Sequence, residues 1–127
     1  MKLCELPYAK IILLRDDIAE VIINEGVEMD GGMVDDYHEF LLTNLTSPFS
    51  LLINKINSYA YDFEAQKKLA TLDQINAMAV VAYSRSTKIA TQTLISFPRD
   101  HEWNLKLFDD RTEALNWLLL QQDKIKE

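Results

Sequence analysis

Branched apolar residues gather in two short runs near the start of the chain, 9–15 and 18–24. Such runs favour extended strands, and only Asp16 and Asp17 lie between them, which is the length of a two-residue hairpin turn. A polar connector, 25–32, follows and holds all three glycines of the chain. The pattern therefore predicts an antiparallel hairpin at the beginning of the fold.

Apolar positions then recur alternately with helical and with strand-like spacing. Residues 33–45 repeat at intervals of three and four, which is typical of an amphipathic helix. The other face of this helix, which we expect to be solvated, carries Asp35, Asp36, His38 and Glu39. Further strands are predicted at 49–54, 77–83 and 105–108, and further helices at 62–72, 84–97 and 110–119.

The order of these elements predicts the fold class. A hairpin that leads into alternating helices and strands is typical of an α/β protein with a partly parallel sheet. We expect a five-stranded mixed sheet packed with four helices. The 127 residues are predicted to form a single domain, 1–127, because this length is near the usual size of one domain.

Composition restricts the function classes. The net charge of −7 opposes the phosphate contacts on which nucleic-acid binding depends, so we expect no nucleic-acid partner. No apolar run approaches the ~20 residues of a transmembrane helix, and the first residues lack the pattern of a signal peptide. The single cysteine, Cys4, excludes an intramolecular disulfide. A cytoplasmic protein is expected.

The end of the chain carries the most specific motif, Phe108-Asp109-Asp110 followed by Glu113-Ala114-Leu115-Asn116-Trp117-Leu118. With the hairpin and its following helix, and with the Ala- and Val-rich strand that leads into a helix beginning at Ser84, this motif resembles the SpoIIAA-like family. That family is related to the STAS domains of bacterial anti-sigma-factor antagonists. The resemblance implies a small SpoIIAA/STAS-like domain that binds a protein partner or a small ligand and has no known reaction.

One property of STAS relatives is not expected here. Some of them are switched by phosphorylation of a serine at the start of the helix after the third strand. Asp62 aligns with the aspartate that precedes that serine, but Phe63 follows it in this chain. Ser58 lies several residues earlier, in a predicted loop. A phosphorylation switch is therefore not carried over by the resemblance.

Catalytic and metal-binding patterns are weak. The chain has no glycine-rich phosphate loop and no Gly-x-Ser-x-Gly elbow, and Cys4 lies in an N-terminus expected to fray. Asp35, His38 and Glu39 lie within about one helical turn, yet a metal site favours more imidazole or thiolate ligands. His101 lies in a predicted turn. We expect no enzyme activity, no cofactor and no metal.

The candidate site lies at the carboxyl ends of the parallel strands, where ligands bind in open α/β sheets. Two segments follow those strands and supply hydroxyls, amides, aromatic rings and two cations. The candidate residues are Asn57, Ser58, Tyr59, Tyr61, Ser84, Arg85, Ser86 and Lys88. Alternatively, the serines only cap a helix, the two cations are solvated, and the tyrosines cover the edge of the sheet.

Two function classes follow, with an enzyme as a third and weaker one. The leading hypothesis is a non-enzymatic regulatory or binding module that engages a protein partner or a small anionic ligand at the strand ends. The alternative is a carrier of a lipid or another small apolar ligand, which needs an apolar cavity beyond the core. The sequence does not decide the oligomeric state.

Overall fold

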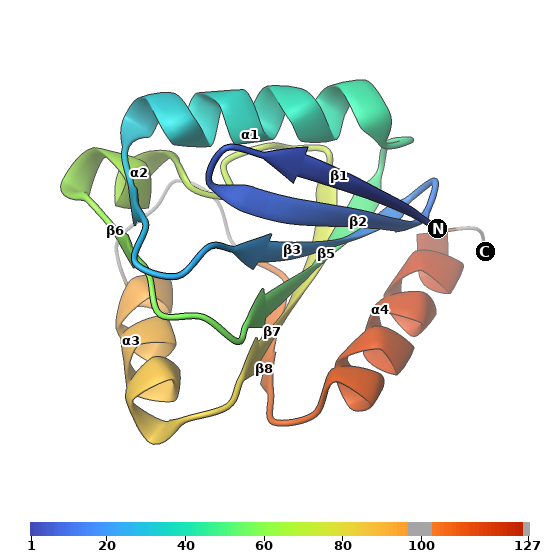
Figure 1. The fold of residues 1–127 in the computed structure, drawn as a ribbon. Coiled ribbons are helices and arrows are strands. Elements are labelled where there is room, and N and C mark those ends of the chain that lie inside the picture. Colours follow the sequence, from blue (N-terminus) through green and yellow to red (C-terminus); the bar gives the residue numbers. More distant parts are fainter. Residues whose placement is uncertain (97–102, 126–127) are drawn as a thin grey trace.

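The computed structural model describes residues 1–96 and 103–125, which form a six-stranded mixed sheet with helices on both faces (Figure 1). In spatial order the strands are β1 (Lys2–Leu6), β2 (Ala9–Arg15), β3 (Ile18–Ile23), β5 (Phe49–Lys55), β7 (Ile75–Ala82) and β8 (Leu105–Phe108). The first three pair antiparallel, whereas β3, β5, β7 and β8 run parallel. The predicted mixed α/β sheet is confirmed.

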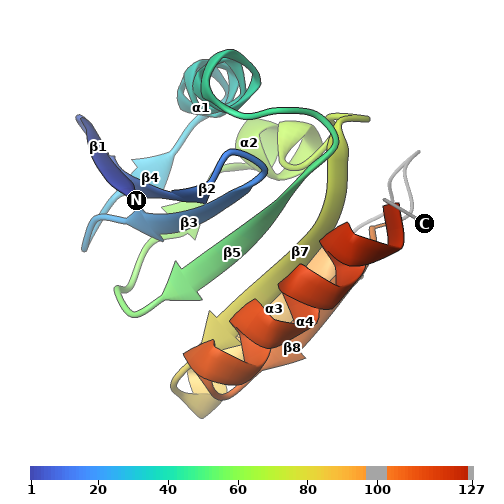
Figure 2. The same cartoon turned by 90° about the vertical axis from the view of Figure 1, so that its right-hand side faces the viewer.

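The helices of the described residues are α1 (Gly31–Asn44), α2 (Phe63–Lys68), α3 (Arg85–Ile95) and α4 (Arg111–Ile125). Helix α4 covers one face of the sheet, and α3 lies behind the sheet on the other face (Figure 2). Helices α1 and α2 share the face of α3. Within 1–96 and 103–125, no helix combines the length and the apolar character that a bilayer span requires.

The sheet has one strand more than the five we predicted. Strand β1 pairs with β2 from Lys2 opposite Leu13 to Leu6 opposite Ala9. It was missed because an edge strand needs few apolar residues, and charged residues interrupt the short 2–6 segment. Cys4, expected in a frayed terminus, therefore lies within a paired strand.

Other boundaries also differ from the prediction. The polar connector 25–32 and the loop 57–61 contribute β4 (Glu28–Met29) and β6 (Ala60–Tyr61), which pair in parallel as a small second sheet. Asp30 caps α1 two residues earlier than the apolar pattern indicated. Helix α2 ends at Lys68, well before residue 72, and Ala70 then has a left-handed φ of 56°. The turn predicted at His101 and the helix end at 97 lie outside the described residues.

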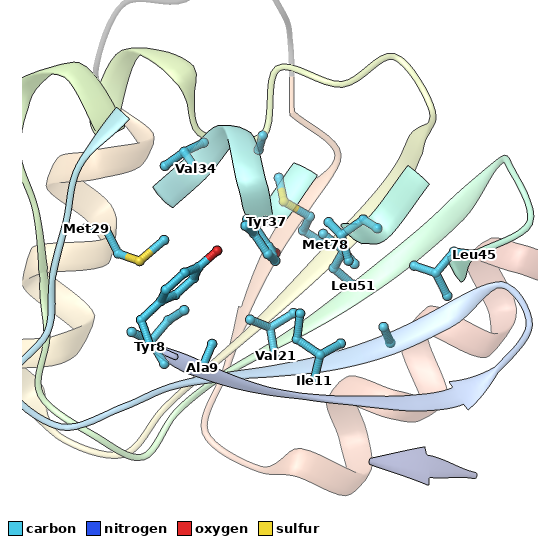
Figure 3. Close-up of a cluster of buried hydrophobic side chains, with 14 of the residues drawn as sticks. Tyr8, Ala9, Ile11, Val21, Met29, Val34, Tyr37, Leu45, Leu51 and Met78 are labelled. Atoms are coloured by element: carbon cyan, nitrogen blue, oxygen red, sulfur yellow. The ribbon is translucent and has the colours of Figure 1, made fainter. Parts of the chain in front are cut away.

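The larger core lies between α1 and the sheet. Figure 3 shows Val34 and Tyr37 of α1 directed at the strand side chains, with Val21 and Leu51 below them. The hydroxyl of Tyr8 donates a hydrogen bond to the carbonyl oxygen of Met33 at 3.0 Å, which fixes the β1–β2 turn against the start of α1. These contacts hold α1 firmly on the sheet.

The second core lies under α4. Ala114, Leu118 and Gln122 are buried at intervals of four residues, so one stripe of α4 faces the sheet. Asp110 caps this helix, because its Oδ2 accepts a hydrogen bond from the backbone N–H of Glu113 at 3.1 Å. The aspartates of the closing motif therefore include a helix cap, which is an architectural role.

Candidate functional site

An apolar cavity lies between the sheet and the helices α1 and α3, on the face opposite α4. Its free volume is about 40 Å³, and it is partly open to solvent. The parallel strands supply its floor, and the helices supply its walls. Floor residues include Val21, Leu51, Ile53, Met78 and Val80, and wall residues include Tyr37, His38, Thr91, Leu94 and Ile95.

Helix α3 covers this cavity while burying little of its own surface. Thr91 is its buried residue, whereas Ile89 and Ile95 are 52% and 39% exposed. Even the Thr91 hydroxyl is engaged within the helix, because it donates to the carbonyl oxygen of Thr87 at 2.8 Å. A helix with so little buried apolar surface is displaced at low free-energy cost. The wall formed by α3 is therefore the one that a ligand can move.

Lys55 places a positive charge beside the cavity. It is the last residue of β5, and strand alternation directs it to the same face as Leu51 and Ile53. Its Nζ lies 4.8 Å from the ring centroid of Tyr59 and 5.5 Å from that of Tyr61. Burial lowers the pKa of Lys55 to about 8, so the amine is mostly protonated at neutral pH.

No carboxylate within 1–96 and 103–125 lies at ion-pair distance from the Lys55 ammonium. The two aromatic rings contribute a cation–π attraction, which is worth about 0.5–2 kcal/mol, but they accept no strong hydrogen bond from Nζ. The described part of the chain therefore leaves this half-buried cation without a counter-ion.

The two tyrosines of the candidate site contact each other, and Tyr61 lines the cavity. Their rings pack edge to face with centroids 5.5 Å apart, and the Tyr61 hydroxyl donates to the Tyr59 oxygen at 3.4 Å. Burial raises the pKa of Tyr61 to about 12 and the pKa of Tyr59 well above its ordinary value. Both are neutral and half-buried, and both pack against the larger core.

His38 is the second polar group of the cavity, and our prediction of a solvated position was wrong. The residue is 7% exposed, and its Nε2 has no hydrogen-bond partner among the described residues. Val34 and Leu41 are buried four residues before it and three after it, so His38 belongs to the same stripe. Burial lowers the pKa of His38 against an opposing effect of Asp35, so the imidazole is neutral at pH 7.

Asn57 and Ser58 lie at the predicted edge of the sheet but are turned away from β7. The Asn57 side-chain amide donates to the carbonyl oxygen of Ile23 at 3.0 Å. The backbone N–H of Ser58 donates to Oε2 of Glu25 at 2.7 Å. These bonds fix the 56–60 segment beside β3, where it supports the tyrosine pair.

The second predicted segment, at the start of α3, is engaged with its own helix and with Asp109, which follows β8. Ser84 caps α3, and its Oγ accepts a hydrogen bond from the backbone N–H of Thr87 at 3.2 Å. Ser86 lies 3.2 Å from the Ser84 hydroxyl, and Lys88 forms an ion pair with Asp109. Arg85 is exposed. None of these contacts involves the Asn57–Ser58 pair.

Sequence reasoning missed a polar network on the opposite face. Glu20 of β3 is 2% exposed and accepts hydrogen bonds from Arg111 Nη2 at 2.6 Å and from Asn54 Nδ2 at 2.8 Å. Burial raises the pKa of Glu20, but these donors outweigh it, and the net pKa lies below the ordinary value. Because its groups hold α4 to the sheet, we interpret this network as structural. A lone glutamate within an apolar strand was its signal in the sequence.

A second hollow, of about 180 Å³, lies at the amino ends of β7 and β8. It is polar, and its amides are engaged by α4. Asn76 Nδ2 donates to the carbonyl oxygen of Gln121 at 3.2 Å, and Asn104 Nδ2 donates to Gln121 Oε1 at 3.1 Å. Groups that already hydrogen bond within the fold offer little to a ligand, so the smaller apolar cavity is the better candidate site.

Comparisons with known proteins agree with this architecture. Neither a protein-family model nor a curated protein matches the chain. Among solved structures, it is similar to an uncharacterised protein of the DUF3478 family from Shewanella loihica PV-4, described as having a SpoIIAA-like fold. The TM-score is 0.54 at 17% identity, over 87% of this chain and 91% of the other. This chain therefore has a SpoIIAA-like fold, as the closing motif and the element order indicated.

Proposed function

We propose that this protein is a non-enzymatic binding module whose small ligand occupies the apolar cavity between the sheet and α3. The observation that carries the proposal is an almost wholly apolar space under a helix that buries only one of its described residues, Thr91. Ligand sites are typically apolar hollows with a few polar groups. Here those polar groups are Lys55, His38 and Tyr61.

The size of the cavity decides how the ligand enters. An engineered apolar cavity that takes benzene has a volume of about 150 Å³, which exceeds the roughly 40 Å³ found here. A ligand of several carbon atoms therefore has to move α3 outward. The exposed fractions of Ile89 and Ile95 support this movement, because little apolar contact is lost when the helix shifts.

A small ligand is favoured over a protein partner bound by the polar residues of the strand ends. Lys88 is paired with Asp109, Ser84 is a helix cap, and Asn57 is bonded to the backbone of β3. A partner would have to compete with these internal contacts. In the cavity, the Tyr61 hydroxyl is bonded to Tyr59, but among the described residues His38 Nε2 has no hydrogen-bond partner and Lys55 has no carboxylate partner.

An uncharged probe tests the proposal. Octan-1-ol should bind with one-to-one stoichiometry in isothermal titration calorimetry, and it should be recovered chemically unchanged by mass spectrometry. Thr91→Phe directs a ring into the cavity and should weaken binding about tenfold or more. Octanol that fails to bind the wild-type protein overturns the proposed function, as does turnover of the bound probe.

The chain offers a matched control two residues further along α3. Thr93 is exposed, and like Thr91 it donates its hydroxyl hydrogen bond to a carbonyl oxygen of its own helix, that of Ile89, at 3.0 Å. Thr93→Phe therefore makes the same chemical change outside the cavity and should leave octanol affinity within about twofold. Equal effects of both variants would contradict binding at this cavity.

A further inference from the structure

We propose that the ligand is an amphiphilic monocarboxylate whose carboxylate pairs with the Lys55 ammonium while its hydrocarbon chain lies on the apolar floor of the cavity. This inference rests on the proposed function and adds the chemical class of the ligand. Its geometric basis is that one cation and one apolar space meet at the carboxyl end of β5.

The charge of Lys55 is the first argument. A half-buried ammonium is costly unless an anion accompanies it, and within the described residues no carboxylate does so. The rings of Tyr59 and Tyr61 lie beside the half-buried amine, so a carboxylate arriving there would form a charge-assisted hydrogen bond at a partly desolvated position. An anionic head group is the complement of this position.

The number of charges favours a carboxylate over a phosphate ester. Lys55 is the lysine that lines the cavity, and His38 is neutral at pH 7. A dianionic phosphate commonly takes a cluster of cations or the free N–H groups of a helix start. At the start of α3, the Ser84 hydroxyl already accepts the hydrogen bond of the Thr87 N–H. A head group with a single negative charge therefore matches Lys55, the one cation among the described residues that lines the cavity.

His38 gives an independent indication that the cavity receives a polar atom. Its Nε2 is buried and without a partner among the described residues, while the side chain lines the same space as Lys55. Buried polar atoms are rarely left unpaired, since each such atom is penalised by its lost hydration. A purely hydrocarbon ligand would leave both groups unpaired, whereas an amphiphile with oxygen atoms brings acceptors into the cavity.

Three probes of equal chain length separate this inference from the proposed function. Octanoate, octan-1-ol and octylamine are titrated at pH 7 against the wild-type protein by calorimetry. Octanoate should bind about tenfold more tightly than octanol, because a hydrogen bond to a charged group is added, and octylamine should bind most weakly. This ranking requires no substitution, so it does not depend on the folding of a variant.

Two substitutions then place the effect at Lys55. Lys55→Met preserves length and should lower the affinity for octanoate about tenfold, to about the affinity of the wild-type protein for octanol. Lys55→Arg retains the charge and should retain the preference for octanoate. Wild-type protein that binds octanol as tightly as octanoate overturns the carboxylate inference and leaves the binding function standing. Octanol and octanoate both failing to bind would overturn both.

Discussion

Helices α3 and α4 lie on opposite faces of the same parallel strands and are held there very differently. Helix α4 buries Ala114, Leu118 and Gln122, and its first residue, Arg111, is tied to the buried Glu20. Helix α3 buries only Thr91 of its described residues and lies above a free apolar space. A helix fixed by both apolar and polar contacts is architecture, whereas a lightly held one leaves room for a ligand.

The polar contacts of the α4 face show the same distinction at the level of single atoms. Gln122 Nε2 donates to Asp17 Oδ2 at 2.9 Å, and its Oε1 accepts from the Ser50 hydroxyl at 2.5 Å. These groups therefore satisfy one another within the fold. On the α3 face, and among the described residues, His38 Nε2 has no hydrogen-bond partner and Lys55 has no carboxylate within ion-pair distance. Asn54 Oδ1 on the α4 face is also buried without a partner among the described residues, so we place function on the α3 face because its unpaired groups line an apolar cavity.

The largest difference in stability between the two faces is expected when a buried side chain of α4 is shortened. Leu118 is fully buried, so Leu118→Ala should lower the free energy of unfolding by about 3 kcal/mol. Ile95→Ala on α3 should lower it by less than about 1 kcal/mol, because Ile95 is 39% exposed. Urea denaturation measures both. Similar losses in the two variants would show that α3 is as firmly packed as α4.

A smaller effect is expected from the ion pair that anchors α4. Arg111→Met leaves Glu20 buried without its cation and should lower the free energy of unfolding by about 2 kcal/mol at pH 7. The matched control is Lys88→Met, which breaks the solvent-exposed pair with Asp109 and should lower it by no more than about 1 kcal/mol. A loss in Arg111→Met no larger than in the control would refute the anchoring role.

The smallest effect, and one of opposite sign, is expected at Lys55. Its pKa is about 8 in the folded protein against an ordinary value of 10.5, so between these pH values the unfolded chain binds more protons. Stability conferred by this position therefore rises as pH increases from 8 to 10.5. At pH 7, Lys55→Met should raise the free energy of unfolding by up to about 1 kcal/mol.

That advantage of Lys55→Met should shrink toward zero by pH 10.5, where the wild-type amine is neutral in the folded state. Thermal unfolding at pH 7, 9 and 10.5 checks the trend. A variant less stable than wild type at pH 7 would show that the ammonium is well accommodated, and the argument for a missing counter-ion would fail.

Much of the architecture could be predicted because it depends on local pattern. Runs of branched residues marked β2, β3 and β5. The caps Asp62, Ser84 and Asp110 are local too, since a cap needs only a short polar side chain beside a helical stripe. Strand β1 was missed because an edge strand is specified by its neighbour. Its pairing with β2 supplies what its own sequence lacks.

The candidate site was predicted only in part, for a related reason. Sequence order placed the ends of β5 and β7 at one edge, and Tyr61 does line the cavity there. Lys55 was missed although it directly follows the Leu51–Asn54 run. The face on which it lies follows from strand alternation only when the strand is known to extend as far as Lys55. His38 was assigned to the wrong side of α1, since a polar residue within a buried stripe is read as solvated.

The sequence by itself determined the class of fold: the spacing of apolar residues dictates which faces of helices and strands leave water, and that suffices for a SpoIIAA-like α/β sheet. Tertiary structure alone decided which polar side chains are satisfied. Glu20 meets Arg111 across 91 positions of sequence, while Lys55 and His38 meet no such partner within the described residues. Pairing depends on distance in space, and on that difference the proposed function rests.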